Sequence, residues 1–272
     1  MTAPWVAQGR LTAGGRALDY ACHGPAPDQA PTLVLLHEGL GCVALWRDFP
    51  SRLAQATGFG VFVYSRAGYG QSDPCDLPRP LDYMTREAVE VLPEVLDAIG
   101  FRHGVLVGHS DGATIAAIHA GSVIDTRVRG IVLMAPHVFT EDMGLDQIAK
   151  AKTAYDTGDL RARLAMYHAD PDCAFRGWND AWLAPGFRDW NVSDVIDYVR
   201  VPILAIQGRQ DEYGTLAQID EIEARSYAPV DTLILDGCRH VPFADQPDAV
   251  TDAIAEYCAR LTRIEAARAT GL

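Results

Sequence analysis

Three residues far apart in the sequence have the side chains needed for nucleophilic attack on an acyl carbon. Ser110 lies in the segment GHSDG (108–112), Asp211 ends the segment GRQD, and His240 lies in GCRHVPF. A serine hydroxyl is a poor nucleophile near neutral pH, so it needs a base within hydrogen-bond reach and a group that orients the base. An imidazole and a carboxylate can fill these two roles.

The segment around Ser110 lies between a predicted strand and a predicted helix. The apolar residues 105–107 (VLV) precede it, and residues 113–120 (ATIAAIHA) follow it. In a chain with 24 glycines a G-x-S-x-G motif alone is a weak signal. Its position between strand and helix is typical of a nucleophile held in a strained turn. The start of the helix also directs its dipole and free N–H groups toward this site.

Asp211 and His240 are each weak signals when taken alone. An aspartate in a glycine-containing turn is often an Asx turn or a helix cap, and a loop histidine often binds nothing. Each residue, however, follows a different predicted strand, where open α/β sheets place their ligands. The order Ser, Asp, His along the chain strengthens the interpretation. Glu212 and Asp236 compete with Asp211 for the role of the carboxylate.

Short apolar runs alternate with helical patterns and define the elements that would position these residues. Helices are expected at 82–99, 111–121 and 247–261, with a kink or break at Pro93. This alternation predicts an α/β fold with a wound, mostly parallel sheet. The expected strands cover residues 32–37, 61–65, 105–108, 131–135, 202–207 and 230–235.

The strand rhythm stops between residues 137 and 199, where helical patterns and an aromatic segment take its place. We expect a helical cap inserted at 137–199, with the core formed by 1–136 and 200–272. Aromatic residues of the cap, including Trp178 and Trp182, would form a buried seam against the core or line an apolar pocket.

The composition is that of a globular protein and disfavours several classes. Of 272 residues, 49% are hydrophobic, and the formal net charge of −13 disfavours nucleic-acid and anionic-membrane partners. A cytoplasmic location is expected, because no apolar run could span a bilayer and the first ten residues do not resemble a signal peptide. Six cysteines without CxxC spacing favour reduced thiols over disulfides or a metal site.

Four parts of the sequence resemble the α/β-hydrolase superfamily, and together they cover nearly the whole chain. They are HEGLG (37–41), SRAGYGQSD (65–73), GHSDG, and the pair GRQD and GCRHVPF. The resemblance implies the α/β-hydrolase fold, a mostly parallel central sheet flanked by helices with an inserted helical cap. It implies that Ser110 is the nucleophile, His240 the general base and then acid, and Asp211 the orienting carboxylate, with no cofactor or metal.

The same resemblance implies an oxyanion hole built from the backbone N–H groups of Gly39 and Asp111. Glu38 occupies a position where the family usually has glycine. Because a carboxylate in the hole would oppose the oxyanion, we expect the Glu38 side chain to turn away and bond Arg66 or a backbone N–H. If it faces the pocket instead, Glu38 could bind a polar group of the substrate.

The two neighbours of Ser110 each have two interpretations. Asp111 is either a carboxylate favoured by the helix dipole or a pocket anion that recognises an amine. His109 is a candidate pocket residue, although packing beneath the turn is the simpler role for it.

The expected function is hydrolysis of a small carboxylic ester, lactone or related acyl compound through an acyl-enzyme. One alternative is a carbon–carbon bond hydrolase that cleaves a diketone-like ring-fission product with the same three residues. Another is a ligand-sensing homologue in which hydrolysis is slow or absent. The expected partner is a small molecule, and the sequence does not distinguish a monomer from a homodimer.

Overall fold

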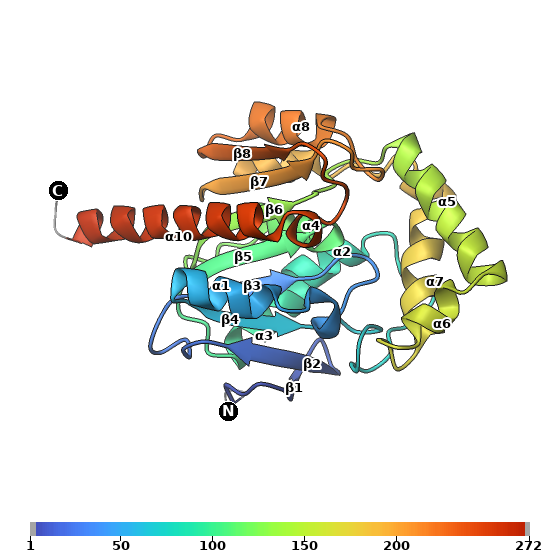
Figure 1. Ribbon diagram of the computed structural model, residues 1–272, viewed down its shortest axis with the longest axis horizontal. Helices are drawn as coiled ribbons and strands as arrows, with labels where there is room; N and C mark the ends of the chain where they lie inside the picture. Colours follow the sequence, from blue (N-terminus) through green and yellow to red (C-terminus); the bar gives the residue numbers. More distant parts are fainter. Residues whose placement is uncertain (1–3, 270–272) are drawn as a thin grey trace.

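The alternating apolar runs form one mixed sheet in the computed structural model, which describes residues 4–269 (Figure 1). Within these residues the sheet has eight strands in the order β1-β2-β4-β3-β5-β6-β7-β8. From β4 onward in this order the strands are parallel, which confirms the predicted α/β-hydrolase type of sheet. The bounds are β1 Gly9–Ala13, β2 Arg16–His23, β3 Thr32–Leu36, β4 Gly60–Tyr64, β5 Gly104–His109, β6 Val128–Met134, β7 Ile203–Gly208 and β8 Val230–Leu235.

The first two strands form a hairpin that the sequence analysis did not predict. β1 pairs with β2, and β2 with β4, both antiparallel. The turn consists of Gly14 and Gly15, whose φ angles of 57° and 67° suit glycine. The hairpin places two antiparallel strands at one edge of the sheet and leaves the parallel strands to carry the site.

Helices cover both faces of the sheet, which is why β3, β4 and β5 are buried along their whole length. Phe49 of α1 and Ile254 of α10 belong to the apolar cluster on one face, where these two helices lie side by side (Figure 1). Leu92 of α3 and Ile115 of α4 belong to the cluster on the other face. The bounds are α1 Phe49–Thr57, α2 Tyr83–Arg86, α3 Leu92–Ala98, α4 Asp111–Ser122, α8 Ala217–Arg225, α9 Pro242–Asp245 and α10 Pro247–Ala269.

The helix predicted at 82–99 changes its hydrogen-bond pattern next to its proline. α2 passes into a π-helical turn at Glu87–Val91, and α3 begins at Leu92 with Pro93 in its first turn. Proline lacks an N–H and cannot donate a hydrogen bond to the preceding turn, and the π-helical turn lies just before it. The chain stays helical from Tyr83 to Ala98, so the predicted break is wrong, and a kink at Pro93 stays a prediction.

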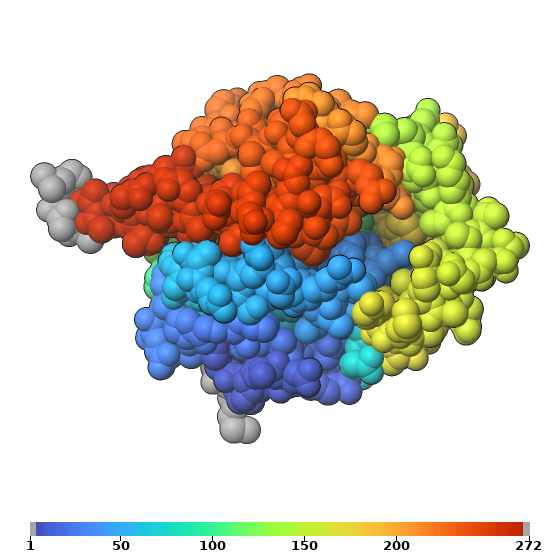
Figure 2. Space-filling model, in the orientation of Figure 1, coloured from blue at the N-terminus to red at the C-terminus, as the bar shows by residue number. Residues whose placement is uncertain are grey.

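Between β6 and β7 the chain forms helices at the end of the sheet where β5 leads into α4 (Figure 1). They are α5 Asp142–Thr157, α6 Leu160–Leu164 and α7 Pro171–Trp182. Tyr155 of α5 stacks on Phe175 of α7 with ring centroids 3.8 Å apart, which ties the two helices together. Figure 2 shows this segment, in yellow-green and yellow, as one end of the molecule. The division into a core and a cap at 137–199 stays a prediction.

None of the helices within residues 4–269 is both long enough and apolar enough to cross a membrane.

Candidate active site

Ser110 occupies a strained turn between β5 and α4. Its φ and ψ angles are 52° and −120°, a conformation that side-chain-bearing residues rarely adopt. The flanking glycines allow this turn, because a Cβ on Gly112 would lie 1.9 Å from the carbonyl oxygen of Leu36, and one on Gly108 would lie 2.2 Å from that of Gly112. The motif GHSDG therefore folds as its type predicts, with the serine held at the end of a buried strand.

The structure brings Ser110, His240 and Asp211 together in one hydrogen-bonded chain. Nε2 of His240 lies 3.0 Å from Oγ of Ser110. Nδ1 of the same ring lies 2.8 Å and 2.9 Å from the two carboxylate oxygens of Asp211. Ser110 follows β5, His240 follows β8 and Asp211 follows β7. Because these parallel strands end at the same edge of the sheet, the three side chains can meet there.

Asp211 is buried and held as an anion that faces His240. Its side chain is 1% exposed, Oδ1 accepts a hydrogen bond from the backbone N–H of Tyr213 at 2.8 Å, and Oδ2 accepts one from Nε2 of Gln207 at 2.9 Å. Burial by itself raises the pKa of this carboxyl, but the hydrogen bond and charge of His240 and the N–H of Tyr213 outweigh it, so the pKa lies below its ordinary value.

Neither of the two competing carboxylates forms a hydrogen bond with His240 within residues 4–269. Asp236 pairs with Arg209 at the surface, at 2.6 Å. Glu212 lines the pocket, and no hydrogen bond joins it to His240 within residues 4–269. Asp211 is the carboxylate that contacts the imidazole.

The backbone N–H groups predicted for an oxyanion hole belong to residues that line the same pocket as Ser110. The N–H of Asp111 opens α4, so it has no acceptor within its own helix. Gly39 lies against the indole of Trp178, and a Cβ at this position would fall 2.2 Å from Nε1. The buried guanidinium of Arg66 donates hydrogen bonds to the carbonyl oxygens of His37 and Glu38, which fixes the loop that carries Gly39.

Glu38 lines the pocket, and its side chain contacts His109 rather than Arg66. Its Oε2 lies 3.4 Å from Nδ1 of His109, whereas Arg66 bonds only the main-chain carbonyl of Glu38, at 3.0 Å. The expected bond from Arg66 to the Glu38 carboxylate is therefore wrong, because the guanidinium donates its hydrogen bonds to main-chain carbonyl oxygens instead. Burial raises the pKa of Glu38, but the contacts with His109 outweigh it and the pKa is lowered.

His109 is not among the residues that line the pocket, which corrects its assignment as a pocket candidate. Its side chain is fully buried, and Nε2 lies 2.7 Å from the carbonyl oxygen of His240. Because a carbonyl oxygen only accepts hydrogen bonds, Nε2 of His109 is the donor. His109 thus supports the main chain of the His240 loop from below.

A model of the alpha/beta hydrolase family matches residues 33–253. The chain belongs to the alpha/beta hydrolase family. A proline iminopeptidase of Lactobacillus helveticus is 22% identical over 295 residues, which cover 93% of this chain and 97% of the relative.

Solved structures show the same fold at low identity. The enol-lactonase of Burkholderia xenovorans LB400 has a TM-score of 0.74 at 19% identity, over 92% of this hydrolase and 100% of that chain. The 2-hydroxy-6-oxo-6-phenylhexa-2,4-dienoate hydrolase of Rhodococcus sp. strain RHA1 has a TM-score of 0.76 at 19% identity. The match covers 92% of this chain and 97% of that chain. At these identities the likeness supports the fold alone.

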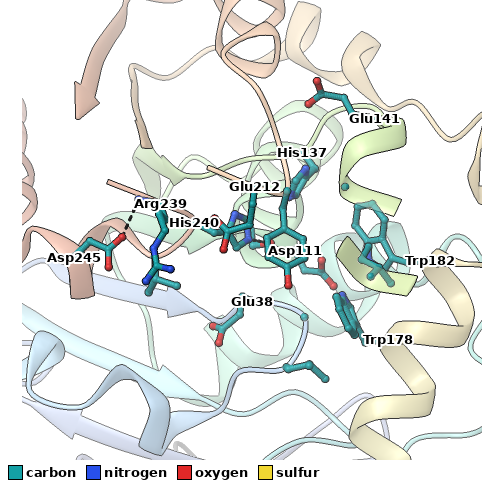
Figure 3. A pocket seen from close by; sticks show the side chains of 17 residues that line it. Glu38, Asp111, His137, Glu141, Trp178, Trp182, Glu212, Arg239, His240 and Asp245 are labelled. Carbon is teal, nitrogen blue, oxygen red and sulfur yellow. Dashed lines mark hydrogen bonds between the residues drawn. The ribbon is translucent and has the colours of Figure 1, made fainter. Parts of the chain in front are cut away.

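The pocket of this hydrolase is a cavity of about 340 Å³, and Ser110 is among the residues that line it. Figure 3 shows this pocket from close by. Trp178 and Trp182 of α7 line one wall, as the sequence analysis predicted. Both are also less than one-tenth exposed and belong to the apolar cluster shared with α4. The aromatic segment therefore forms both a seam and a pocket wall.

Two residues that were not predicted from the sequence pack on the imidazole of His240 in this hydrolase. The ring centroid of His137 lies 5.6 Å from that of His240, and the ring centroid of Tyr213 lies 4.7 Å from it. Burial, and then the neighbouring His240, lower the pKa of His137 to about 3, so it stays neutral near neutral pH. His137 follows β6 at the same sheet edge as Ser110, Asp211 and His240, and this position was the signal that could have found it.

Proposed function

We propose that this chain is a serine hydrolase that cleaves a small carboxylic ester, lactone or related acyl compound through an acyl-enzyme. The observation that supports it most directly is the hydrogen-bonded chain from Asp211 through His240 to Ser110, which ends in a pocket that Ser110 lines. A hydroxyl paired with an oriented imidazole is the arrangement that makes a serine nucleophilic.

In the first half of the reaction Oγ of Ser110 attacks the carbonyl carbon while Nε2 of His240 accepts its proton. The carboxylate of Asp211 stabilises the imidazolium and holds Nδ1–H toward itself. The N–H groups of Gly39 and Asp111 stabilise the oxyanion of the tetrahedral intermediate, and one such donor is worth about 3 kcal/mol. His240 then protonates the leaving group, and the acyl group remains on Ser110.

In the second half, water takes the place of the leaving group. Nε2 of His240 accepts a proton from the water, whose oxygen attacks the acyl carbon. The intermediate collapses, the carboxylic acid leaves, and the proton returns to Ser110. His137 stays neutral beside the imidazole, so it does not compete electrostatically with the imidazolium.

A substrate panel tests this proposal against carbon–carbon cleavage. Purified protein is assayed with p-nitrophenyl esters, small lactones and a vinylogous diketone, each with Ser110→Ala as the blank. Turnover of esters or lactones that disappears in Ser110→Ala is the expected result. Activity confined to the diketone would overturn the ester assignment, and a stoichiometric label on Ser110 without turnover of any acyl compound would favour a ligand sensor.

We also propose that the enzyme acts in the cytoplasm on a small molecule and needs no metal or organic cofactor. The six cysteines are all free thiols in the structure, which suits a reducing compartment. Every proton and bond in the mechanism above is handled by protein side chains and water. Activity should therefore survive dialysis against a chelator, and cell fractionation should recover the protein with the cytoplasm.

A further inference from the structure

The side chain of Asp111 has no role in the mechanism, although its backbone N–H does. Its Oδ2 accepts a hydrogen bond from the hydroxyl of Tyr83, which in turn accepts one from Nε1 of Trp182 at 3.0 Å. Its Oδ1 has no hydrogen-bond partner within residues 4–269, and the residue is only 1% exposed. A buried carboxylate oxygen without a partner is costly, so this atom suits a donor supplied by a ligand.

Burial raises the pKa of Asp111 and the guanidinium groups of Arg66 and Arg79 act to lower it, but the residues that line the pocket carry mostly negative charge. Of the 17 residues that line the pocket, five carry carboxylates and Arg239 is the one that carries a guanidinium. Figure 3 shows Glu38, Asp111 and Glu212 around the middle of the pocket, with Glu141 and Asp245 toward its margins. Glu212 also has a buried Oε2 without a hydrogen-bond partner among the described residues. A cation is the ligand that this set of groups attracts.

The wall next to Asp111 is aromatic. Trp182 reaches Asp111 through the hydroxyl of Tyr83, and Trp178, one helical turn earlier in α7, lines the pocket beside it. Indole faces attract ammonium groups, and this attraction is strongest where water is excluded. Carboxylate oxygen and indole together are suited to an ammonium group rather than to a hydrated metal ion.

The position of Asp111 creates a conflict that a bound cation would resolve. Its N–H is placed to stabilise the oxyanion, while its own carboxylate, one residue from Ser110, would repel that charge. Burial is the main cause that raises the pKa of Asp111, and a cation bound beside the carboxyl would lower it again. A positive charge on the substrate would therefore favour both binding and the transition state.

We propose that the substrate carries a protonated amine a few bonds from the scissile carbonyl, and that the Asp111 carboxylate binds this amine against Trp178 and Trp182. The substrate class is thus an amino-substituted acyl compound. This inference rests on the proposed function, because it assumes that Ser110 reacts at the same pocket.

Two p-nitrophenyl phosphonates test the inference without requiring turnover. They are identical except that one side arm ends in an ammonium group and the other in a methyl group. Each transfers its phosphonyl group to Oγ of Ser110 and releases p-nitrophenolate, so the burst amplitude counts reactive Ser110 and its rate reports recognition. Each rate is divided by the rate of the same phosphonate with hydroxide, which removes intrinsic reactivity.

In the wild-type protein the ammonium compound should react at least about tenfold faster, given the usual strength of charge-assisted hydrogen bonds. Asp111→Asn should bring the ratio of the two rates close to one, whatever it does to the rates themselves. Asp180→Asn is the matched control, because this exposed aspartate of α7 pairs with Lys152 and its substitution changes the net charge equally. It should leave the ratio unchanged.

Each other outcome has its own meaning. A full burst with equal rates in the wild-type protein would overturn the ammonium site and leave the serine hydrolase intact. An unchanged ratio in Asp111→Asn would overturn the assignment to Asp111. The absence of a burst with either phosphonate would overturn the proposed function itself, and this inference with it. The wild-type ratio needs no substitution, so it decides the inference even if a variant does not fold.

Discussion

Nε2 of His240 lies 3.0 Å from Oγ of Ser110, although 130 positions separate these residues in the sequence. The sheet order explains the contact, because β5, β7 and β8 run parallel and the segments that follow them meet at one edge. Ser110 sits in its turn directly after β5, and the loop of His240 is held from below by His109. The activity should therefore depend on groups that keep this imidazole in place.

Replacing Asp211 by asparagine should lower kcat by about 10³ to 10⁴, with the fold retained. The amide cannot stabilise the imidazolium and favours the wrong tautomer of His240. The measurement is kcat on the best p-nitrophenyl ester. Asp236→Asn is the control, since Asp236 is an exposed surface residue paired with Arg209, and it should change kcat little. Equal activity of both variants would move the carboxylate role away from Asp211.

Replacing Gly39 by alanine should lower kcat by about 10² to 10³, the usual effect of losing one oxyanion donor. The new methyl group would meet Nε1 of Trp178 at 2.2 Å, so the loop that carries the N–H must shift. Adding Trp178→Leu removes the obstacle and should restore part of kcat on a neutral ester. Wild-type kcat in Gly39→Ala alone would show that this loop does not supply the donor.

The neutral state of His137 should make the protein less stable in acid. In the unfolded chain a histidine gains its proton near pH 6.5, whereas the pKa of His137 in the folded protein is about 3. Between these two pH values the unfolded state holds more protons than the folded state, so the free energy of unfolding falls as the pH falls. The loss is about 1.4 kcal/mol per pH unit and amounts to a few kcal/mol in total. Below pH 3 this contribution stops changing.

The test is urea unfolding of the wild-type protein and of His137→Gln at neutral pH and near pH 4.5. Glutamine does not titrate, so the variant should lose less stability between the two conditions than the wild type does. Identical losses in both proteins would show that His137 is not the group that takes up the proton.

The central part of the fold could be predicted from the sequence because its strands are buried on both faces. Val61, Val105 and Ile131 each lie in an uninterrupted apolar run, and such runs need no alternation to be recognised. β1 has the mixed burial of an edge strand, which resembles a loop in composition. The pair Gly14 and Gly15 between two runs was the available signal for its hairpin.

The three side chains of the site could also be predicted, because each follows a strand and their order along the chain is informative. What could not be predicted was the choice among partners in the interior. Arg66 could have met either the carboxylate or the carbonyl of Glu38, and only the packing of the loop selects the carbonyl. His109 likewise points beneath the His240 loop, which no spacing rule indicates.

Rapid mixing with a p-nitrophenyl ester tests the central claim most directly. An acyl-enzyme mechanism predicts a burst of p-nitrophenolate equal to one per chain, followed by slower turnover, and an acyl group on the peptide that contains Ser110 when the reaction is quenched in acid. Ser110→Ala should show neither. A burst and an acylated peptide of the same size in Ser110→Ala, or an acyl group found on a different residue of the wild-type protein, would contradict the account.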